Sequence, residues 1–117
     1  MIVGIGVDIA DISRVEAALQ RTPALAARLF AESEQDAPML SMAGSFAAKE
    51  AVAKALGGPP GLRWTDVTVE HDQLGRPLLC ITGTVQEAAE KLGVAAWHLS
   101  LSHDGGFCVA MVVAEGA

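Results

Sequence analysis

Two carboxylates and one lysine are the side chains of this sequence best suited to chemistry. Asp8 stands near the end of an apolar run that starts at Met1, where an ionised carboxylate costs free energy unless a cation or hydrogen-bond donors compensate it. Glu50 and Lys54 are four residues apart in a run of good helix formers, so they share one helix face. Mg²⁺ takes one or two protein carboxylates and keeps several waters. Asp8, Glu50 and Lys54 together would therefore suit a magnesium-bound pyrophosphate.

Each of these residues also has an ordinary structural interpretation. Asp8 can lie at an exposed strand end and cap the helix that follows it. Glu50 and Lys54 can form a solvated ion pair, which is the commonest meaning of this spacing and contributes roughly a few tenths of a kcal/mol. Taken singly, the glutamate and lysine favour the ion pair. Only the combination with Asp8 favours a metal site.

A second polar group stands near the C-terminus, in the segment Ser100-Leu101-Ser102-His103. On a strand, Ser100 and Ser102 point to one face, and His103 comes just before a turn, so phosphate oxygens would find several hydrogen-bond donors. The competing interpretation is polar alternation on an edge strand that ends in a surface histidine.

The elements that must position these residues follow one another as strand, two to three helices, β-hairpin, helix, β-hairpin. This order indicates the α+β class rather than repeated βαβ units. Apolar spacing, caps and turn residues predict a strand over 1–9, helices from 11 or 13 to about 20, from about 24 to 30 and over 39–56, a hairpin of 65–71 and 78–81, a helix over 84–92, and strands over 96–102 and 107–113. Glu32 to Pro38 is polar and acidic and is predicted to be a loop.

Length and composition limit the class of protein. The chain has 117 residues, 51% hydrophobic and 19% charged, which is typical of one globular domain over 1–117 that subunit contacts would help to stabilise. No apolar run approaches the ~20 residues of a membrane span, and no secretory signal is recognisable, so a cytoplasmic location is expected. Cys80 and Cys108 lie outside any metal-binding spacing and are expected to be buried free thiols. A net charge of -6 and 4% aromatic residues argue against nucleic-acid binding.

Four blocks of the sequence occur in a recognisable order. They are Gly4-Ile5-Gly6-Val7-Asp8-Ile9 followed by Ile12-Ser13-Arg14, then Phe46-Ala47-Ala48-Lys49-Glu50-Ala51 with Lys54-Ala55-Leu56-Gly57, then Gly75-Arg76-Pro77, and finally Ser100-Leu101-Ser102-His103. Together they resemble the holo-acyl-carrier-protein synthase family of 4'-phosphopantetheinyl transferases over nearly the whole chain. The resemblance implies the compact fold of that family. It also implies transfer of the 4'-phosphopantetheine arm of coenzyme A to a serine hydroxyl of an apo acyl carrier protein, with release of adenosine 3',5'-bisphosphate.

The resemblance also implies roles for individual residues. Asp8 and Glu50 would be the Mg²⁺ ligands and, with Lys54, the catalytic set. The residues implied to contact coenzyme A are Lys49, Lys54, Gly57, Arg76, Ser102 and His103. The proton of the acceptor serine would go either to Glu50 or to a metal-bound water, and the sequence leaves this open. Family members form trimers with coenzyme A between neighbouring subunits, so a homotrimer is expected.

The acyl carrier protein partner is acidic in such systems, and this chain is acidic too, so a local basic patch is needed. Arg14 and Arg21 are seven residues apart on one face of the first predicted helix, which docks the carrier in the family. Two scattered arginines on a solvated helix face are the alternative. The sequence does not separate fatty acid from polyketide carriers, nor does it indicate which acyl forms of coenzyme A are accepted.

One position departs from the family pattern. An arginine usually precedes the Phe-Ala-Ala-Lys-Glu segment, and Ser45 stands there instead. Either a nucleotide or carrier contact is lost, or another basic residue such as Lys49 or Arg63 replaces it. This departure motivates an alternative function, a catalytically weak paralogue that binds carrier protein or coenzyme A. A further alternative is a small metabolite-binding oligomer in which Asp8 and Glu50 are only a cap and an ion pair.

Overall fold

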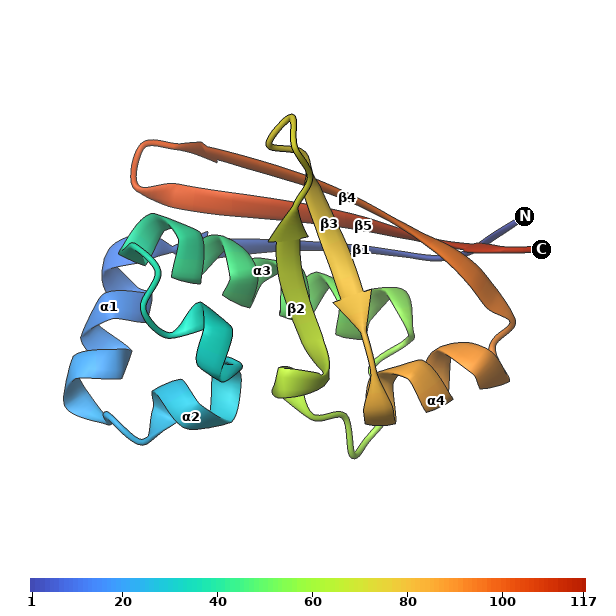
Figure 1. Cartoon of the computed structure of the whole chain (residues 1–117), viewed down its shortest axis with the longest axis horizontal. Helices are drawn as coiled ribbons and strands as arrows, with labels where there is room; N and C mark the ends of the chain where they lie inside the picture. Colours follow the sequence, from blue (N-terminus) through green and yellow to red (C-terminus); the bar gives the residue numbers. More distant parts are fainter.

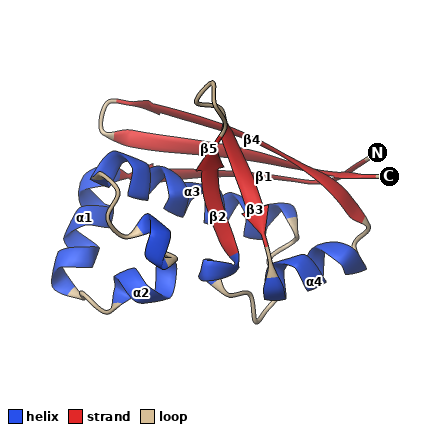
Figure 2. Ribbon diagram, in the orientation of Figure 1, coloured by secondary structure: helices blue, strands red, loops and turns tan.

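Helix α3 (Met39–Ala55) lies between a three-stranded sheet and a two-stranded hairpin, with α1 and α2 toward one end of the molecule and α4 toward the other (Figures 1 and 2). The computed structural model describes residues 1–117. The remaining elements are β1 (Ile2–Asp11), α1 (Ile12–Arg21), α2 (Leu25–Leu29), the 3₁₀ turns η1 (Glu32–Glu34) and η2 (Trp64–Asp66), β2 (Val67–His71), β3 (Pro77–Ile81), α4 (Gly83–Lys91), β4 (Val94–Asp104) and β5 (Phe107–Gly116). The predicted α+β order is confirmed.

The three-stranded sheet joins the first strand to the closing hairpin in the order β1-β5-β4, with both pairs antiparallel. The predicted hairpins β2–β3 and β4–β5 are both present. Strands β4 and β5 run several residues longer than predicted, because their outer residues pair with each other and with β1. The joining of β1 to β5 is a long-range pairing that local sequence patterns do not reveal.

The contact between β1 and α3 is unusually close. A Cβ built on Gly4 would lie 1.8 Å from the carbonyl oxygen of Ala55, and one built on Gly6 would lie 1.8 Å from that of Ala51. No side chain fits at either position, so the strand backbone rests directly on the helix. The helix side of this contact is built from small residues, since Ala47, Ala51 and Ala55 are all buried.

Alternation along the sheet gives it two different faces. The residues of β1 in step with Gly4 and Gly6 face α3, and Asp8 is the next of them. The opposite face, called the open face below, exposes apolar side chains on two neighbouring strands. Its members are Ile5, Val7 and Ile9 of β1 and Val109, Met111 and Val113 of β5, with Phe107 at the end of β5.

The helix termini follow their capping residues. Asp11 caps α1, because its carboxylate accepts hydrogen bonds from the backbone N–H groups of Ser13 at 3.0 Å and Arg14 at 3.3 Å. The capping role considered for Asp8 is therefore wrong. Helix α3 ends where predicted, with Gly57 in the left-handed region at φ 83° and its N–H donating to the Lys54 carbonyl.

The predicted loop from Glu32 to Pro38 is partly structured. It contains the 3₁₀ turn η1, and one of its glutamates, Glu34, is buried. Cys80 and Cys108 are free, as predicted, and Cys108 is buried while Cys80 is half-buried. None of the helices is both long enough and apolar enough to cross a membrane.

The close approach of β1 and α3 predicts a large effect of one methyl group. Gly6→Ala should destabilise the protein by about 2–3 kcal/mol or more, because the added Cβ meets backbone atoms that cannot rotate away. Gly44→Ala is the matched control: its added Cβ lies 3.9 Å from a Leu101 methyl, so the helix should gain up to about 1 kcal/mol. Urea unfolding of both variants measures the difference, and similar stabilities would contradict the interpretation.

Candidate functional site

Asp8, Glu50 and Lys54 come together at the edge of the sheet beside α3. The Lys54 Nζ donates to Asp8 Oδ1 at 3.0 Å and to the Val7 carbonyl oxygen at 3.0 Å. Lys54 therefore pairs with Asp8 across two elements, and no ion pair forms between Lys54 and Glu50. The helix-surface ion pair considered from the sequence is wrong. These three residues are called the acidic cluster below.

The environment of Glu50 disfavours its charge. Burial raises the pKa of Glu50 above its ordinary value of 4.5, the nearby Asp8 carboxylate raises the pKa further, and Lys54 lowers it in part. The Lys54 side chain is half exposed, whereas the Asp8 side chain is only 15% exposed. With both carboxylates ionised, the cluster carries two negative charges, of which the Lys54 ammonium balances one.

The donor set fits Mg²⁺. Two carboxylates that repel each other offer hard oxygen ligands, and a divalent cation would relieve that repulsion. No group of three or more histidine, cysteine, aspartate or glutamate side chains is arranged to hold a metal. A site with two protein carboxylates matches the habit of magnesium, which retains water ligands, better than that of zinc. The assignment of Asp8 and Glu50 as ligands remains a prediction.

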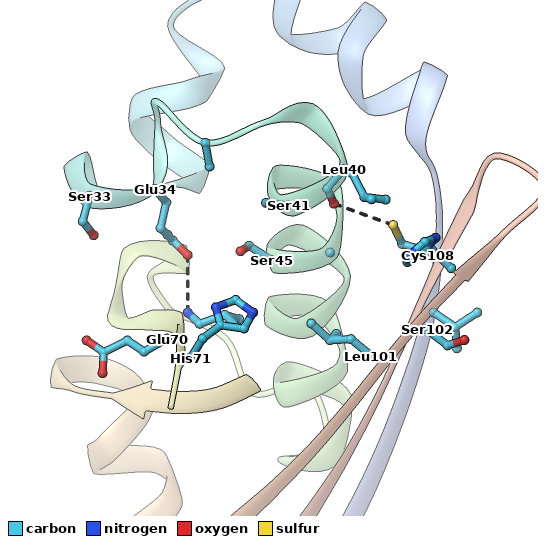
Figure 3. A pocket seen from close by; sticks show the side chains of 15 residues that line it. Ser33, Glu34, Leu40, Ser41, Ser45, Glu70, His71, Leu101, Ser102 and Cys108 are labelled. Atoms are coloured by element: carbon cyan, nitrogen blue, oxygen red, sulfur yellow. Dashed lines mark hydrogen bonds between the residues drawn. The ribbon is translucent and has the colours of Figure 1, made fainter. Parts of the chain in front are cut away.

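A cavity of about 500 Å³ opens on another side of α3. The walls come from residues 31–37, called the η1 segment below, and from the first half of α3, strand β2 and the β4–β5 hairpin (Figure 3). The lining residues are Ser33, Glu34, Ala37, Leu40, Ser41, Gly44, Ser45, Val69, Glu70, His71, Leu101, Ser102, His103, Cys108 and Val109. Ser102 and His103, the predicted phosphate contacts, belong to this cavity, whereas Asp8 and Glu50 do not.

Ser102 and His103 lie on opposite faces of the sheet. Ser102 pairs across the strands with Val109, and His103 pairs with the buried Cys108, so His103 shares the α3 side of the sheet. Ser100 and Ser102 share the open face, which confirms the expected alternation. Among the predicted site residues, Asp8, Glu50 and Lys54 form the acidic cluster, and Ser102 and His103 border the cavity on another side of α3.

The prediction that Lys49 contacts coenzyme A is wrong in this structure. Its side chain is 0% exposed, and its Nζ donates to Glu34 Oε1 at 2.9 Å, to the Trp64 carbonyl at 3.0 Å and to the Val67 carbonyl. An ammonium has three donors, and all three are used. Burial lowers the pKa of Lys49, and Glu34 opposes that shift. Because its side chain is buried and all its donors are used, Lys49 also cannot replace the arginine that the family usually has at position 45.

The other predicted contacts lie at the surface. Gly57 is exposed at the C-terminal end of α3, one turn from Lys54. Arg76 is exposed in the β2–β3 turn, where its Nε donates to Asp72 Oδ2 at 3.3 Å. Arg14 and Arg21 are both exposed on α1, about 10 Å apart along the helix axis. Their binding roles stay predictions.

Sequence reasoning missed most of the cavity wall. Glu34 stood in an expected loop, and His71 had no sequence neighbour that suggested a site. The spacing of Ser41, Ser45 and Lys49 was an available signal, because polar residues every four positions in an otherwise small and apolar helix mark a face that meets polar surroundings. In the structure this face meets the cavity and the buried Glu34.

Comparison with known proteins identifies close relatives. A family model described as the 4'-phosphopantetheinyl transferase superfamily matches residues 4–112. The chain is 57% identical over 118 residues to the holo-[acyl-carrier-protein] synthase of Micrococcus luteus, with 98% of this chain and 93% of that protein covered. It is 56% identical over 121 residues to the enzyme of that name from Streptomyces coelicolor, with 98% of each covered.

Solved structures show the same fold. The holo-[acyl-carrier-protein] synthase of Neisseria meningitidis superposes with a TM-score of 0.85 at 32% identity, covering 98% of this chain and 99% of that one. The Helicobacter pylori enzyme, solved in complex with coenzyme A, gives a TM-score of 0.82 at 32% identity, covering 95% and 99%. The fold expected from the resemblance is confirmed.

The raised pKa of Glu50 predicts how the metal-free protein responds to pH. The protonated form stabilises the fold below about pH 4.5, and this stabilisation is lost as the pH rises through the higher pKa of the folded state. Without metal at pH 7, Glu50→Gln should therefore melt at or above the temperature of the wild type. Millimolar Mg²⁺ should raise the wild-type Tm by about 1–5 °C and leave the variant unchanged. Thermal unfolding with Mg²⁺ or a chelator measures both effects, and an equal Mg²⁺ response would contradict the ligand assignment.

Proposed function

This chain belongs to the 4'-phosphopantetheinyl transferase superfamily, and we propose that it acts as a holo-acyl-carrier-protein synthase in which Asp8 and Glu50 hold Mg²⁺. The reaction moves the 4'-phosphopantetheine group from coenzyme A to a serine hydroxyl of an apo acyl carrier protein and releases adenosine 3',5'-bisphosphate. The observation that supports this proposal most directly is the acidic cluster. Two carboxylates and a lysine from β1 and α3 converge at one accessible point.

The residues of the cluster have distinct tasks in this proposal. Mg²⁺ held by Asp8 and Glu50 would neutralise charge on the pyrophosphate of coenzyme A. The Lys54 side chain is half exposed and forms an ion pair with Asp8, so its ammonium can turn to a pyrophosphate oxygen without losing a buried partner. Because the cluster is built on a strand and a helix, it would hold Mg²⁺ and the Lys54 ammonium in fixed positions. The pyrophosphate bound to them would then present its phosphoryl group for in-line attack by the serine hydroxyl.

The division of the site residues supports a site shared between subunits. Within one subunit the acidic cluster and the cavity with His103 lie on different sides of α3. A coenzyme A molecule held between two subunits would meet Asp8, Glu50 and Lys54 of one copy and the cavity of the next. The coenzyme A complex of the Helicobacter pylori relative supports coenzyme A as the ligand.

The open face of the sheet supports a homotrimer. Its apolar side chains form a continuous surface on β1 and β5, the kind of patch that stable oligomers cover. The chain is small, so burying this surface would add materially to a modest stability. The three-fold arrangement is the family expectation, and the exposed apolar face is what this chain contributes to it.

The carrier protein is proposed to dock on α1. Arg14 and Arg21 are exposed there, and Arg14 lies at the rim of an apolar groove of about 260 Å³ between α1 and α2. An acidic partner with an apolar side chain at its contact would match this combination of charge and groove.

Ser45 is buried in the wall of the cavity, so the arginine it replaces is lost on the coenzyme A side. A cytoplasmic location remains a prediction.

The proposed function predicts a defined product and a defined dependence on Asp8. The wild type, mixed with apo acyl carrier protein, coenzyme A and Mg²⁺, should give carrier protein heavier by one phosphopantetheine group, measured by intact mass. Asp8→Asn should lower kcat/KM by about 100-fold or more, because one metal ligand loses its charge. Glu87→Gln makes the same kind of change on the exposed surface of α4 and should leave the rate unchanged. Absence of the wild-type adduct would refute the proposal.

The trimer proposal predicts that one charge on the open face separates the subunits. Met111→Lys places an ammonium in the middle of that face, and it should give monomers and lose most transferase activity, because the site needs two copies. Leu74→Lys changes an apolar residue that is even more exposed, in the β2–β3 turn, and should leave the trimer intact. Light scattering after size-exclusion chromatography distinguishes these outcomes, and a monomeric active wild type would contradict the proposal.

A further inference from the structure

The buried ion pair of Lys49 and Glu34 has no part in the chemistry described above, yet it joins three separate segments. The Glu34 carboxylate accepts from the Lys49 Nζ at 2.9 Å, from the Ala31 N–H at 3.0 Å and from the Val69 N–H at 3.4 Å. Lys49 also donates to the carbonyls of Trp64 and Val67. A single pair therefore connects the η1 segment, helix α3 and the start of strand β2.

The η1 segment depends on this pair for its attachment. Every backbone hydrogen bond made by residues 31–37 stays within the segment. The side-chain bonds that reach other elements all end on the Glu34 carboxylate, which accepts from the Lys49 Nζ and from the Val69 N–H, while Gln35 Nε2 donates to the carbonyl of Phe30, the residue just before the segment. Phe30 anchors the start of the segment, because its side chain is buried and the Lys49 ammonium lies 5.7 Å from its ring centroid.

The same segments form walls of the 500 Å³ cavity. Ser33, Glu34 and Ala37 line it from the η1 segment, and Glu70 and His71 line it from β2. Figure 3 shows Glu34 directed from its segment toward Glu70 and His71. Lys49 is fully buried behind these walls, so it affects a ligand in the cavity only through their spacing.

We propose that Lys49 and Glu34 are positioning residues for coenzyme A: their buried pair fixes the η1 segment and strand β2 to α3 and so sets the width of the cavity that receives the ligand. The proposal rests on the proposed function, since it takes coenzyme A as the occupant. It assigns Lys49, which adjoins the metal-ligand candidate Glu50 in sequence, to substrate binding through the protein rather than to contact with phosphate. A purely structural pair would affect stability and leave substrate affinity unchanged.

The test removes both charges together. Lys49→Met alone would leave a buried, unpaired carboxylate and should lower the Tm by about 10 °C or more. The double variant Lys49→Met/Glu34→Gln leaves no unpaired charge and should recover most of that loss, because neutral replacements of buried pairs are often tolerated. In the double variant we expect KM for coenzyme A to rise about tenfold, with kcat and KM for the carrier protein within about twofold of the wild type.

Two further variants keep the test decisive. Val85→Ala removes buried methyl groups away from the cavity, so it should lower the Tm and leave KM for coenzyme A unchanged. Glu34→Asp keeps the charge but is too short to hold Ala31, Lys49 and Val69 together, so it should raise KM for coenzyme A and speed hydrogen exchange of the Ala31 and Val69 amides. If the double variant folds poorly, Glu34→Asp decides the question.

A folded double variant, or Glu34→Asp, with the wild-type KM for coenzyme A would overturn the positioning proposal. That outcome leaves the proposed function intact, because it presupposes an active wild type. A wild type that forms no phosphopantetheine adduct would instead refute the function itself, so the two failures are distinguishable.

Discussion

The backbone contact between β1 and α3 is the constraint on which the site depends. Gly4 and Gly6 let the strand rest on the carbonyls of Ala55 and Ala51, which fixes both the distance and the rotation of the helix against the sheet. Asp8 follows on the same side of the strand, so its carboxylate meets Lys54 of the helix. The geometry of the metal-ligand candidates is therefore a consequence of two missing side chains.

The rotation of α3 assigns each of its faces to a different task. The face with Ala47, Ala51 and Ala55 packs on the sheet, while Lys54 reaches Asp8 at its edge. The face with Lys49 turns to the buried Glu34. Two lysines five residues apart thus pair with carboxylates in opposite conditions. One pair is accessible and can exchange its partner for a ligand, and the other is saturated and sealed, which suits a fixed support.

The order of elements and several helix ends could be predicted from sequence because they depend on local signals. These signals are apolar spacing, the cap of α1 by Asp11 and the glycine at position 57 after α3. The acidic cluster could be suggested but not assembled, since β1 and α3 are distant in sequence. Lys49 was misjudged for a related reason. A lysine in a motif gives no sign of burial, and its partner Glu34 lies 15 residues away in a segment that reads as a polar loop. Long-range pairing of charges has no local pattern.

The two faces of β1 also make its alignment in the sheet an all-or-none property. Side chains alternate with a period of two, so a slip of β1 by one residue would bring Ile5 or Val7 to the positions where only hydrogen atoms fit against the helix. The same slip would turn Asp8 to the apolar open face. Pairings of β1 with β5 that are shifted by one residue are thus excluded by steric clash with α3. The strand that carries the metal-ligand candidate Asp8 therefore also determines the register of the sheet.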